Sequence, residues 1–346
     1  MIFVDEIPLS NDSPSSPLGS QLLVALMEHP FLTCVSHSLK SMKARKVEVS
    51  TQGRFVYIFQ REYATVDPSL VDFVGTDEAT TCVGIVIRNR KSGMTSVAHM
   101  DFPKIVEFGF TQMLSGLVDQ NFDVEFDVHI LGAFEDLSTK HSNGVIISEH
   151  DLKNDGYSFP LCAKIVETLQ KRQEKFHVQT LFVLGHNTQW DSQGNAYPIF
   201  NGLLVETATG SLNPANFDGT SRCPDEIVRR IRVCASYEDN SWDGKLLETY
   251  DTHNDRFVVA PCCWTIRQRQ IAMAFQHLSD ADILFTCSTS PSAEGPDFVD
   301  NSRRQWNYLI QHPDWRYSFP MRRPRVFERT ADGGWKRCIL VVAQEV

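Results

Sequence analysis

A lone cysteine with a histidine shortly after it is the clearest chemical feature of this sequence. Cys82 ends a run of small polar residues that begins at Thr76, and the next histidine along the chain is His99. A cysteine attacks as its thiolate, and a nearby imidazole both removes the thiol proton and stabilises the anion. Cys82 and His99 are therefore a candidate nucleophile and base, although cysteine is also among the residue types most often buried in a core.

A catalytic histidine needs a third group on its other ring nitrogen to fix its tautomer. Thr76, Asp77 and Thr81 are the nearby residues with suitable side chains. The backbone around Thr81 and Cys82 is a candidate source of N–H donors to an oxyanion, where each donor typically contributes about 3 kcal/mol. From these residues alone, the chain is a candidate cysteine hydrolase.

Two short strands are predicted to bring the cysteine and the histidine together. Residues 82–87 and 94–100 read as strands, and residues 89–93 between them carry turn-forming side chains. Cys82 then lies near the start of one strand and His99 near the end of the next. In an antiparallel pair, those two ends lie side by side.

The elements predicted around this hairpin mix helices and strands without strict alternation. We predict helices over residues 22–27, 105–117, 161–169, 224–233, 266–278 and 296–312. We predict strands over residues 55–59, 70–74, 122–130, 178–184, 199–205 and 256–260, and a terminal hairpin over 327–342. This irregular order favours an α+β fold over a doubly wound one.

Composition narrows the class of protein. The chain has 346 residues, nine cysteines without a disulfide-like spacing and a formal net charge of −10. The sequence has no apolar run of the roughly 18–20 residues that span a bilayer, and no secretory signal at its start. We expect a reduced, intracellular protein in the cytoplasm, with the nucleus as a second location, that binds neither membrane nor nucleic acid.

Metal chemistry is not indicated by the cysteine pattern. Cys262 and Cys263 are adjacent, and the sequence has no Cys-x-x-Cys pair to complete a zinc site. We expect these two cysteines to lie in the core or in a pocket wall, and we expect no metal or organic cofactor.

Four blocks of sequence carry a resemblance to a known family. The longer two are residues 75–82, GTDEATTC, and residues 288–299, STSPSAEGPDFV, the second continuing through a helix to His312 and Pro313. The shorter two are residues 97–101, VAHMD, and residues 261–265, PCCWT. In this order they resemble the eukaryotic protein N-terminal asparagine amidohydrolases over about residues 70–313.

The resemblance implies a fold and three catalytic roles. The family is similar in its active site to bacterial chemoreceptor glutamine deamidases and cytotoxic necrotizing toxins, which implies an α+β sandwich of mixed or antiparallel sheet with flanking helices. In the chemoreceptor deamidases a histidine follows the cysteine by 17 residues and a threonine precedes it by six, as His99 and Thr76 do around Cys82. By this resemblance Cys82 is the nucleophile, His99 the base and Thr76 the group that orients the base.

The resemblance also implies the domain organisation. One domain would span residues 1–346, with a flexible loop over 10–20, a catalytic segment over 70–101 and a substrate-side segment over 256–313. The 10–20 loop and the stretch 136–156 have no counterpart that we can place in the family.

The activity implied by the resemblance is deamidation of an N-terminal asparagine to aspartate through a thioester on the cysteine. The partners would be proteins and peptides with a free N-terminal asparagine, handled by a monomer. The aspartate product would enter the N-degron pathway, which degrades proteins according to their chain termini, by way of an arginyl-transferase.

Selection for a chain terminus requires capture of an ammonium group by an anionic or carbonyl partner. The candidate acids are Asp77, Glu78, Asp101 and Glu294, and the candidate hydrogen-bonding side chains are Thr81, Ser288, Thr289 and Ser290. Any of these residues is equally well explained as a helix cap or a solvated loop residue.

Two other functions fit the same residues. One is a deamidase of internal glutamine or asparagine, and the other is a non-catalytic binding module on the same fold. Acetylation of the substrate terminus separates the first from a terminal amidase, and loss of ammonia release in a Cys82→Ala variant would exclude the second.

Overall fold

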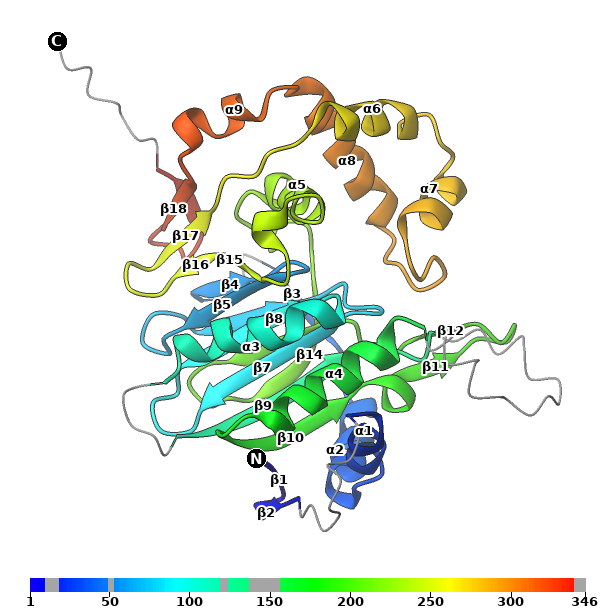
Figure 1. Ribbon diagram of the computed structural model, residues 1–346, viewed down its shortest axis with the longest axis vertical. Coiled ribbons are helices and arrows are strands. Elements are labelled where there is room, and N and C mark those ends of the chain that lie inside the picture. The colour runs from blue at the N-terminus through cyan, green and yellow to red at the C-terminus, as the bar shows by residue number, and fades with distance from the viewer. Residues whose placement is uncertain (10–18, 49–52, 119–123, 137–155, 339–346) are drawn as a thin grey trace.

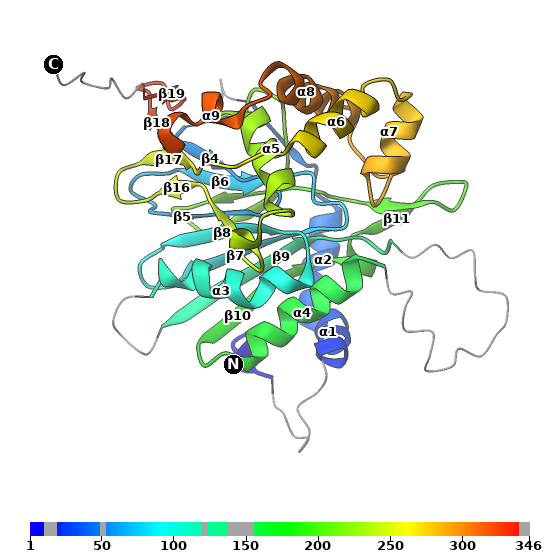
Figure 2. The same ribbon diagram turned by 45° about the horizontal axis from the view of Figure 1, so that its top comes forward.

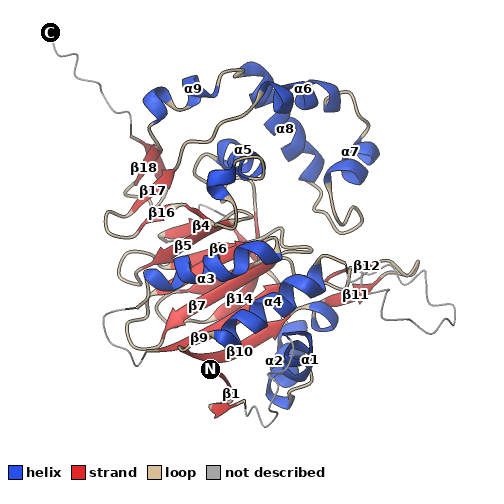
Figure 3. Cartoon of the chain, viewed as in Figure 1, coloured by secondary structure: helices blue, strands red, loops and turns tan. Residues whose placement is uncertain are grey.

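The computed structural model describes residues 1–9, 19–48, 53–118, 124–136 and 156–338, and the predicted 10–20 loop and the 136–156 stretch lie mostly outside them. The fold is mixed α+β (Figures 1 and 3). An eight-stranded sheet and a five-stranded sheet share one core, and helices cover the other face of the larger sheet.

The eight-stranded sheet combines parallel and antiparallel pairs. Its order is β15 (Leu247–Glu248), β5 (Glu62–Val66), β8 (Thr95–Met100), β7 (Val83–Asn89), β9 (Glu125–Gly132), β10 (Lys175–Phe182), β1 (Ile2–Val4) and β2 (Ile7–Pro8). β7 pairs antiparallel with both β8 and β9, whereas β10 pairs parallel with β9 and β1. The strands that carry the candidate site therefore lie in the middle of the sheet.

The five-stranded sheet is also mixed. Its order is β3 (Arg45–Val47), β14 (Leu212–Phe217), β13 (Leu203–Glu206), β6 (Phe73–Thr76) and β4 (Phe55–Tyr57). Two smaller sheets complete the strands: β16 (Tyr250–Asp251), β17 (Arg256–Val259), β18 (Arg325–Arg329) and β19 (Trp335–Arg337), and the pair β11 (Thr188–Trp190) and β12 (Ala196–Pro198).

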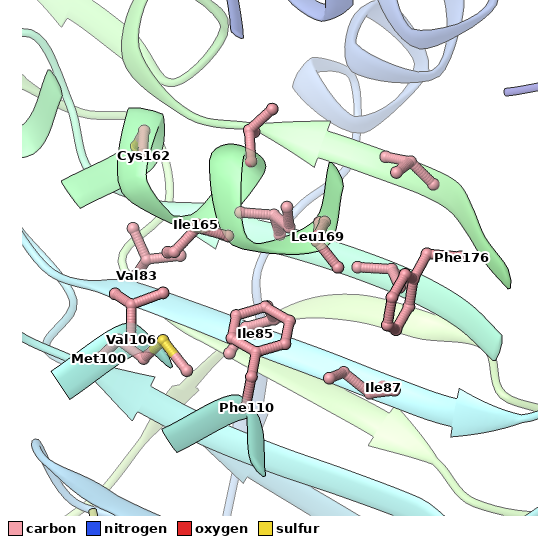
Figure 4. Close-up of a cluster of buried hydrophobic side chains, with 14 of the residues drawn as sticks. Val83, Ile85, Ile87, Met100, Val106, Phe110, Cys162, Ile165, Leu169 and Phe176 are labelled. Carbon is pink, nitrogen blue, oxygen red and sulfur yellow. The ribbon is translucent and has the colours of Figure 1, made fainter. Parts of the chain in front are cut away.

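One core lies between the eight-stranded sheet and the helices α1 (Gly19–Met27), α3 (Val106–Ser115) and α4 (Ser158–Lys171). Figure 4 shows Ile85 and Ile87 of β7 facing Phe110 of α3 and Leu169 of α4. The alternate residue Val86 points to the opposite face and belongs to the core shared with the five-stranded sheet. β7 is thus buried on both faces, which explains its nearly continuous apolar sequence.

A second group of helices lies at the upper end of the molecule in Figures 1 and 2, where Arg229 of its first helix contacts Glu62 of β5 and Tyr57 of β4. It comprises α5 (Glu226–Ser236), α6 (Ile266–Phe275), α7 (Asp280–Cys287), α8 (Phe298–Gln311) and α9 (Trp315–Ser318). α8 packs against α5, α6 and α7. These helices hold the loop between α7 and α8, in which the second long sequence block lies.

The hairpin prediction is confirmed, since β7 and β8 pair antiparallel in the expected positions. The predicted strand 70–74 is shifted, because β6 begins only at Phe73. The sequence analysis missed several elements, among them α2 (Pro30–Lys40), β5, β14 and α7. For α2 the reason is the position of Pro30, which ends the preceding helical pattern but sits in the first turn of a new helix, where proline is well tolerated.

No single helix among the described residues is long and apolar enough to cross a membrane, and only the bent pair α1–α2 passes that test, by length and composition.

Candidate active site

The strand register brings Cys82 and His99 to the same face of the larger sheet. Gly84 of β7 pairs with His99 of β8, and Val83 pairs with Met100. Extending the register by one residue sets Cys82 against Asp101. Paired residues, and residues two apart on one strand, share a face of the sheet, so Cys82, Gly84 and His99 lie on the same face. This face points toward the five-stranded sheet. Gly84, the neighbour of both residues, has no side chain to separate them.

Thr76 reaches the histidine from the facing sheet. Its Oγ1 lies 2.8 Å from Nδ1 of His99, and both side chains are buried. His99 Nε2 is also buried, and among the described residues it has no hydrogen-bond partner. The ring is therefore held through Nδ1, which leaves Nε2 free to accept a proton.

Gly84 makes room for this contact. A Cβ built on Gly84 would lie 2.7 Å from Cδ2 of Leu203 and 3.3 Å from Cγ2 of Thr76. Both distances are shorter than ordinary carbon contacts of about 3.5–4.0 Å. A side chain at position 84 would thus push apart the two sheets where Thr76 meets His99.

The resting cysteine and histidine are both neutral at neutral pH. Burial raises the pKa of the Cys82 thiol, the carboxylates of Asp101 and Glu294 raise it further, and a hydrogen bond with Thr81 opposes them. Burial lowers the pKa of His99 to about 4, against the opposing influence of Glu78 and Glu62. As a residue, Cys82 is nevertheless partly exposed.

Two segments far apart in the sequence meet beside Cys82. Thr81 Oγ1 lies 3.1 Å from Thr289 Oγ1, and Ser290 Oγ donates to Thr80 Oγ1 at 2.9 Å. Within the second segment, the Ser290 N–H donates to Ser288 Oγ at 2.9 Å. The candidate residues Thr81, Thr289 and Ser290 therefore join the segment that contains Cys82 to the loop between α7 and α8.

Glu294 lies on that loop. Its Oε1 accepts a hydrogen bond from the Ser288 hydroxyl. Burial raises the pKa of Glu294 to about 7, partly offset by the Ser288 hydrogen bond, and Glu78 and Asp297 raise it further. This carboxyl group therefore titrates near neutral pH.

Asp101 is the second acid beside the thiol. Its Oδ2 accepts hydrogen bonds from the Tyr237 hydroxyl and from Gln60 Nε2, the latter at 3.3 Å. Its Oδ1 is buried and has no hydrogen-bond partner among the described residues. Burial raises the pKa of this carboxyl group, whereas Tyr237, Arg61 and Gln60 oppose the rise. Asp101 thus has one oxygen available for a ligand.

The other two candidate acids are already bound by arginines. Asp77 accepts hydrogen bonds from Tyr57 at 2.6 Å, from the Phe217 N–H at 2.9 Å and from Arg222 at 3.0 Å. Glu78 receives two hydrogen bonds of 2.9 Å from Arg230 and an ion pair of 2.9 Å from Arg222.

These contacts also affect how the two acids titrate. Burial raises the pKa of Asp77 to about 6 with help from Glu78, although Arg222 opposes the rise. For Glu78 burial acts in the same direction, but Arg230 and Arg222 outweigh it and lower the pKa. Both carboxylates are thereby committed to the protein itself.

The short block at residues 261–265 has a structural part in this arrangement. Trp264 is buried, and its indole N–H donates to the His312 carbonyl at 2.9 Å. Thr265 caps α6 in a capping box with Gln268. Cys262 is buried and Cys263 is exposed, so one of the two fits the predicted core position. The block ties the start of α6 to the end of α8.

The residues that sequence reasoning missed are Gly84, Arg222, Arg230, Tyr237 and Gln60. Neither arginine belongs to a motif, since the carboxylates of Asp77 and Glu78 that they bind lie 145 and 152 positions away in the chain. Gly84 did carry a usable signal, because an isolated glycine inside a strand often marks a close approach of other groups. Among the described residues, no group of three His, Cys, Asp or Glu side chains could hold a metal ion.

Comparison with known proteins gives a consistent picture. The sequence model of the family described as "Protein N-terminal asparagine amidohydrolase" matches residues 45–337. A protein of that name from Arabidopsis thaliana is 58% identical over 98% of this chain and 100% of its own length. Proteins of the same name from mouse and human are 26% and 25% identical, over 96% and 84% of this chain and 98% and 86% of their own lengths.

Proposed function

Because this chain belongs to the protein N-terminal asparagine amidohydrolase family, we propose that it hydrolyses the side-chain amide of an asparagine at the start of a protein or peptide. The products are an N-terminal aspartate and ammonia. The observation that carries the assignment of the site is the hydrogen bond between Thr76 and His99, on the face of the sheet that Cys82 shares.

We propose that His99 acts as a general base rather than as the partner of a preformed thiolate. Since the thiol pKa is raised and the imidazole pKa is lowered, the Cys82 proton moves to His99 Nε2 as sulfur attacks the amide carbon. Backbone N–H groups near Cys82 stabilise the oxyanion. Thr76 holds the imidazole through Nδ1 in this step.

Two bond cleavages complete the reaction. The imidazolium of His99 gives its proton to the leaving nitrogen, the C–N bond breaks, and ammonia departs from a thioester on Cys82. His99 then takes a proton from water, whose oxygen attacks the thioester carbon. The S–C bond breaks, aspartate forms, and the sulfur recovers the proton from His99.

We propose that Asp101 and Glu294 bind the terminal ammonium. Asp77 and Glu78 are unsuitable because arginines already neutralise them. Asp101 has an unpaired buried oxygen, and both acids act electrostatically on Cys82. The ammonium contact selects a terminal residue over an internal one, whereas asparagine and glutamine differ by one methylene, which a pocket distinguishes by about 1–3 kcal/mol.

The broader setting is part of the same proposal. The layered mixed fold is consistent with a relationship to the bacterial glutamine deamidases, and the aspartate product suits entry into the N-degron pathway. We propose that the chain acts as a monomer in the cytoplasm and nucleus. Its net charge of −10 disfavours nucleic acid as a partner.

The test uses an asparagine-initiated peptide, the same peptide acetylated at its terminus, and a glutamine-initiated control. Mass spectrometry and ammonia release should show deamidation of the free asparagine peptide, loss of turnover on acetylation, and no turnover by a Cys82→Ala variant. Cys82→Ser should be nearly inactive, because a serine hydroxyl ionises far less readily. Equal turnover of the acetylated peptide would instead indicate a deamidase of internal residues.

A further inference from the structure

We propose that Arg222 is a positioning residue for the reaction: it locks the segment that carries Cys82 against the loop that carries Glu294. This inference rests on the function proposed above, because it concerns how the two halves of that site are assembled. Arg222 lies between β14 and α5 and belongs to neither half of the site.

Arg222 is bound by three carboxylates from the two halves. Its Nη2 lies 3.0 Å from Asp77 Oδ2, its Nη1 lies 2.9 Å from Glu78 Oε1, and Nη1 also contacts Asp297 Oδ2. Only 6% of the arginine side chain is exposed. Directional, charge-assisted hydrogen bonds on both terminal nitrogens fix the position of this buried guanidinium.

On one side, Arg222 holds the chain between Thr76 and Cys82. Asp77 directly follows the residue that orients His99, and its carboxylate is also fixed by Tyr57 and the Phe217 N–H. Glu78 has a left-handed φ of 63°, which is unfavourable for a residue with a side chain. Its ion pairs hold it in that conformation and so determine the direction in which the chain continues to Cys82.

On the other side, Arg222 holds the loop between α7 and α8. Asp297 lies in the same sequence block as Glu294, three residues after it, and stands at the N-cap position of α8. Its side chain makes no capping hydrogen bond to a backbone N–H of the helix, and its Oδ2 binds Arg222 and also accepts a hydrogen bond from Asn301 Nδ2 at 3.2 Å. The two segments also meet through hydrogen bonds between neutral hydroxyl groups, from Ser290 to Thr80 and between Thr289 and Thr81. These bonds are weaker than the charge-assisted hydrogen bonds of Arg222.

The fork geometry of arginine is essential to this role. The guanidinium presents donors on separate edges, and the two nitrogens of Arg222 reach Asp77 and Asp297 at the same time. A lysine ammonium is a single point charge and cannot bridge both carboxylates in the same way. An Arg222→Lys variant therefore keeps the charge while losing the bridge.

The experiment compares four variants of the full chain, one of them a double variant that combines Asp297→Asn with Arg222→Lys. Asp297→Asn removes the bridge to the α7–α8 loop without removing a helix cap, and Arg222→Lys weakens it from the other side. The control is Asp280→Asn, which breaks an ion pair between α7 and Arg303 of α8 whose acid is 74% exposed. For each variant we would measure kcat and KM on the asparagine peptide, thermal stability, and alkylation of Cys82 by iodoacetamide, followed by peptide mapping.

We expect kcat to fall by about 10- to 100-fold in Asp297→Asn and Arg222→Lys, because a misplaced reacting group costs that much. The alkylation rate of Cys82 should change in both variants, while Asp280→Asn behaves as wild type. The double variant should lose no more activity than Arg222→Lys alone, since both changes break the same contact.

Two results would overturn the inference: wild-type kcat in Asp297→Asn, or additive losses in the double variant. A loss of kcat that only tracks a loss of thermal stability would assign Arg222 a purely structural role and would also contradict it. Failure of the proposed function is a separate outcome, in which the wild-type chain releases no ammonia. The alkylation rates of Cys82 in the variants would then still show whether Arg222 holds the two segments in place.

Discussion

Asp101, one of the two acids beside the thiol, has two opposing effects on its chemistry. Asp101 raises the pKa of Cys82, and in the proposed reaction the same carboxylate binds the terminal ammonium group of the substrate. The arriving ammonium would neutralise the field that keeps the thiol protonated. Substrate binding and nucleophile activation would thus be coupled through Asp101.

Asp101→Asn should separate these two effects. Removal of the charge should speed iodoacetamide alkylation of Cys82 at neutral pH, yet raise KM by about 10- to 100-fold, because a charged hydrogen bond of roughly 1.5–3 kcal/mol is lost. The matched control is Asp243→Asn, whose acid pairs with Lys104 and is 55% exposed. Slower alkylation together with an unchanged KM would contradict the assignment of Asp101.

The kinetic constants should decline in two separate steps as the pH falls, kcat/KM first and kcat later. The pKa of Glu294 is about 7, so below that pH the carboxyl group becomes neutral and kcat/KM for the asparagine peptide should decline. The pKa of His99 is about 4, so the imidazole stays an available base, and kcat should hold until the pH approaches that value.

The control for this profile is Glu294→Gln, which should abolish the decline near pH 7 and leave the decline near pH 4. A profile of kcat/KM with no inflection near neutral pH in the wild type would argue against Glu294 as an ammonium ligand.

At the scale of elements, the separation of the two sheets determines the site. Gly84→Ala should lower kcat by about 10- to 100-fold, because its Cβ would meet Leu203 and Thr76 and displace the group that orients His99. KM should change little, since position 84 faces the histidine rather than the candidate ammonium ligands. Measured kinetics of the alanine variant, with circular dichroism to verify folding, would check this.

A buried ion triad fastens α5 to the eight-stranded sheet. Glu62 of β5 contacts Arg229 and Arg232 at 2.6 Å each, and all three side chains are fully buried. Glu62→Gln should lower the free energy of unfolding by about 3–5 kcal/mol, because two arginines remain without a counter-charge. Glu328→Gln, which breaks an exposed pair with Arg256, should cost at most about 1 kcal/mol.

The same triad gives a signed pH effect on stability. Burial raises the pKa of Glu62, but the two arginines outweigh it and lower the pKa from its ordinary value of 4.5. The stabilisation is therefore complete above pH 4.5 and is lost as the pH falls through the lower, folded-state pKa. Chemical denaturation of wild type and Glu62→Gln should converge in acid, and a constant difference would contradict this account.

Local pattern predicted the hairpin that carries the candidate nucleophile and base, because strand periodicity and turn residues are properties of neighbouring positions. It could not predict which acids remain free. Asp77, Glu78, Asp101 and Glu294 were equivalent as sequence, and only the arrival of Arg222 and Arg230 from elsewhere in the chain separates the neutralised acids from the available ones. Long-range pairing of charges is a property of the folded molecule.

For the molecule as a whole, we expect a monomer. Sedimentation should show one species near the chain mass of 39.3 kDa across a wide concentration range, since a net charge of −10 opposes self-association. A concentration-dependent shift to twice that mass would contradict this.

The neutral resting state of the thiol also bears on how long the protein stays active in the presence of oxidants. Peroxide oxidises thiolates far faster than thiols, and the products beyond sulfenic acid are largely irreversible. Cys82 is only partly exposed and its pKa is raised, so an idle molecule offers little anion to an oxidant. Such a protein would resist oxidation while no substrate is bound and would be vulnerable to it only during turnover.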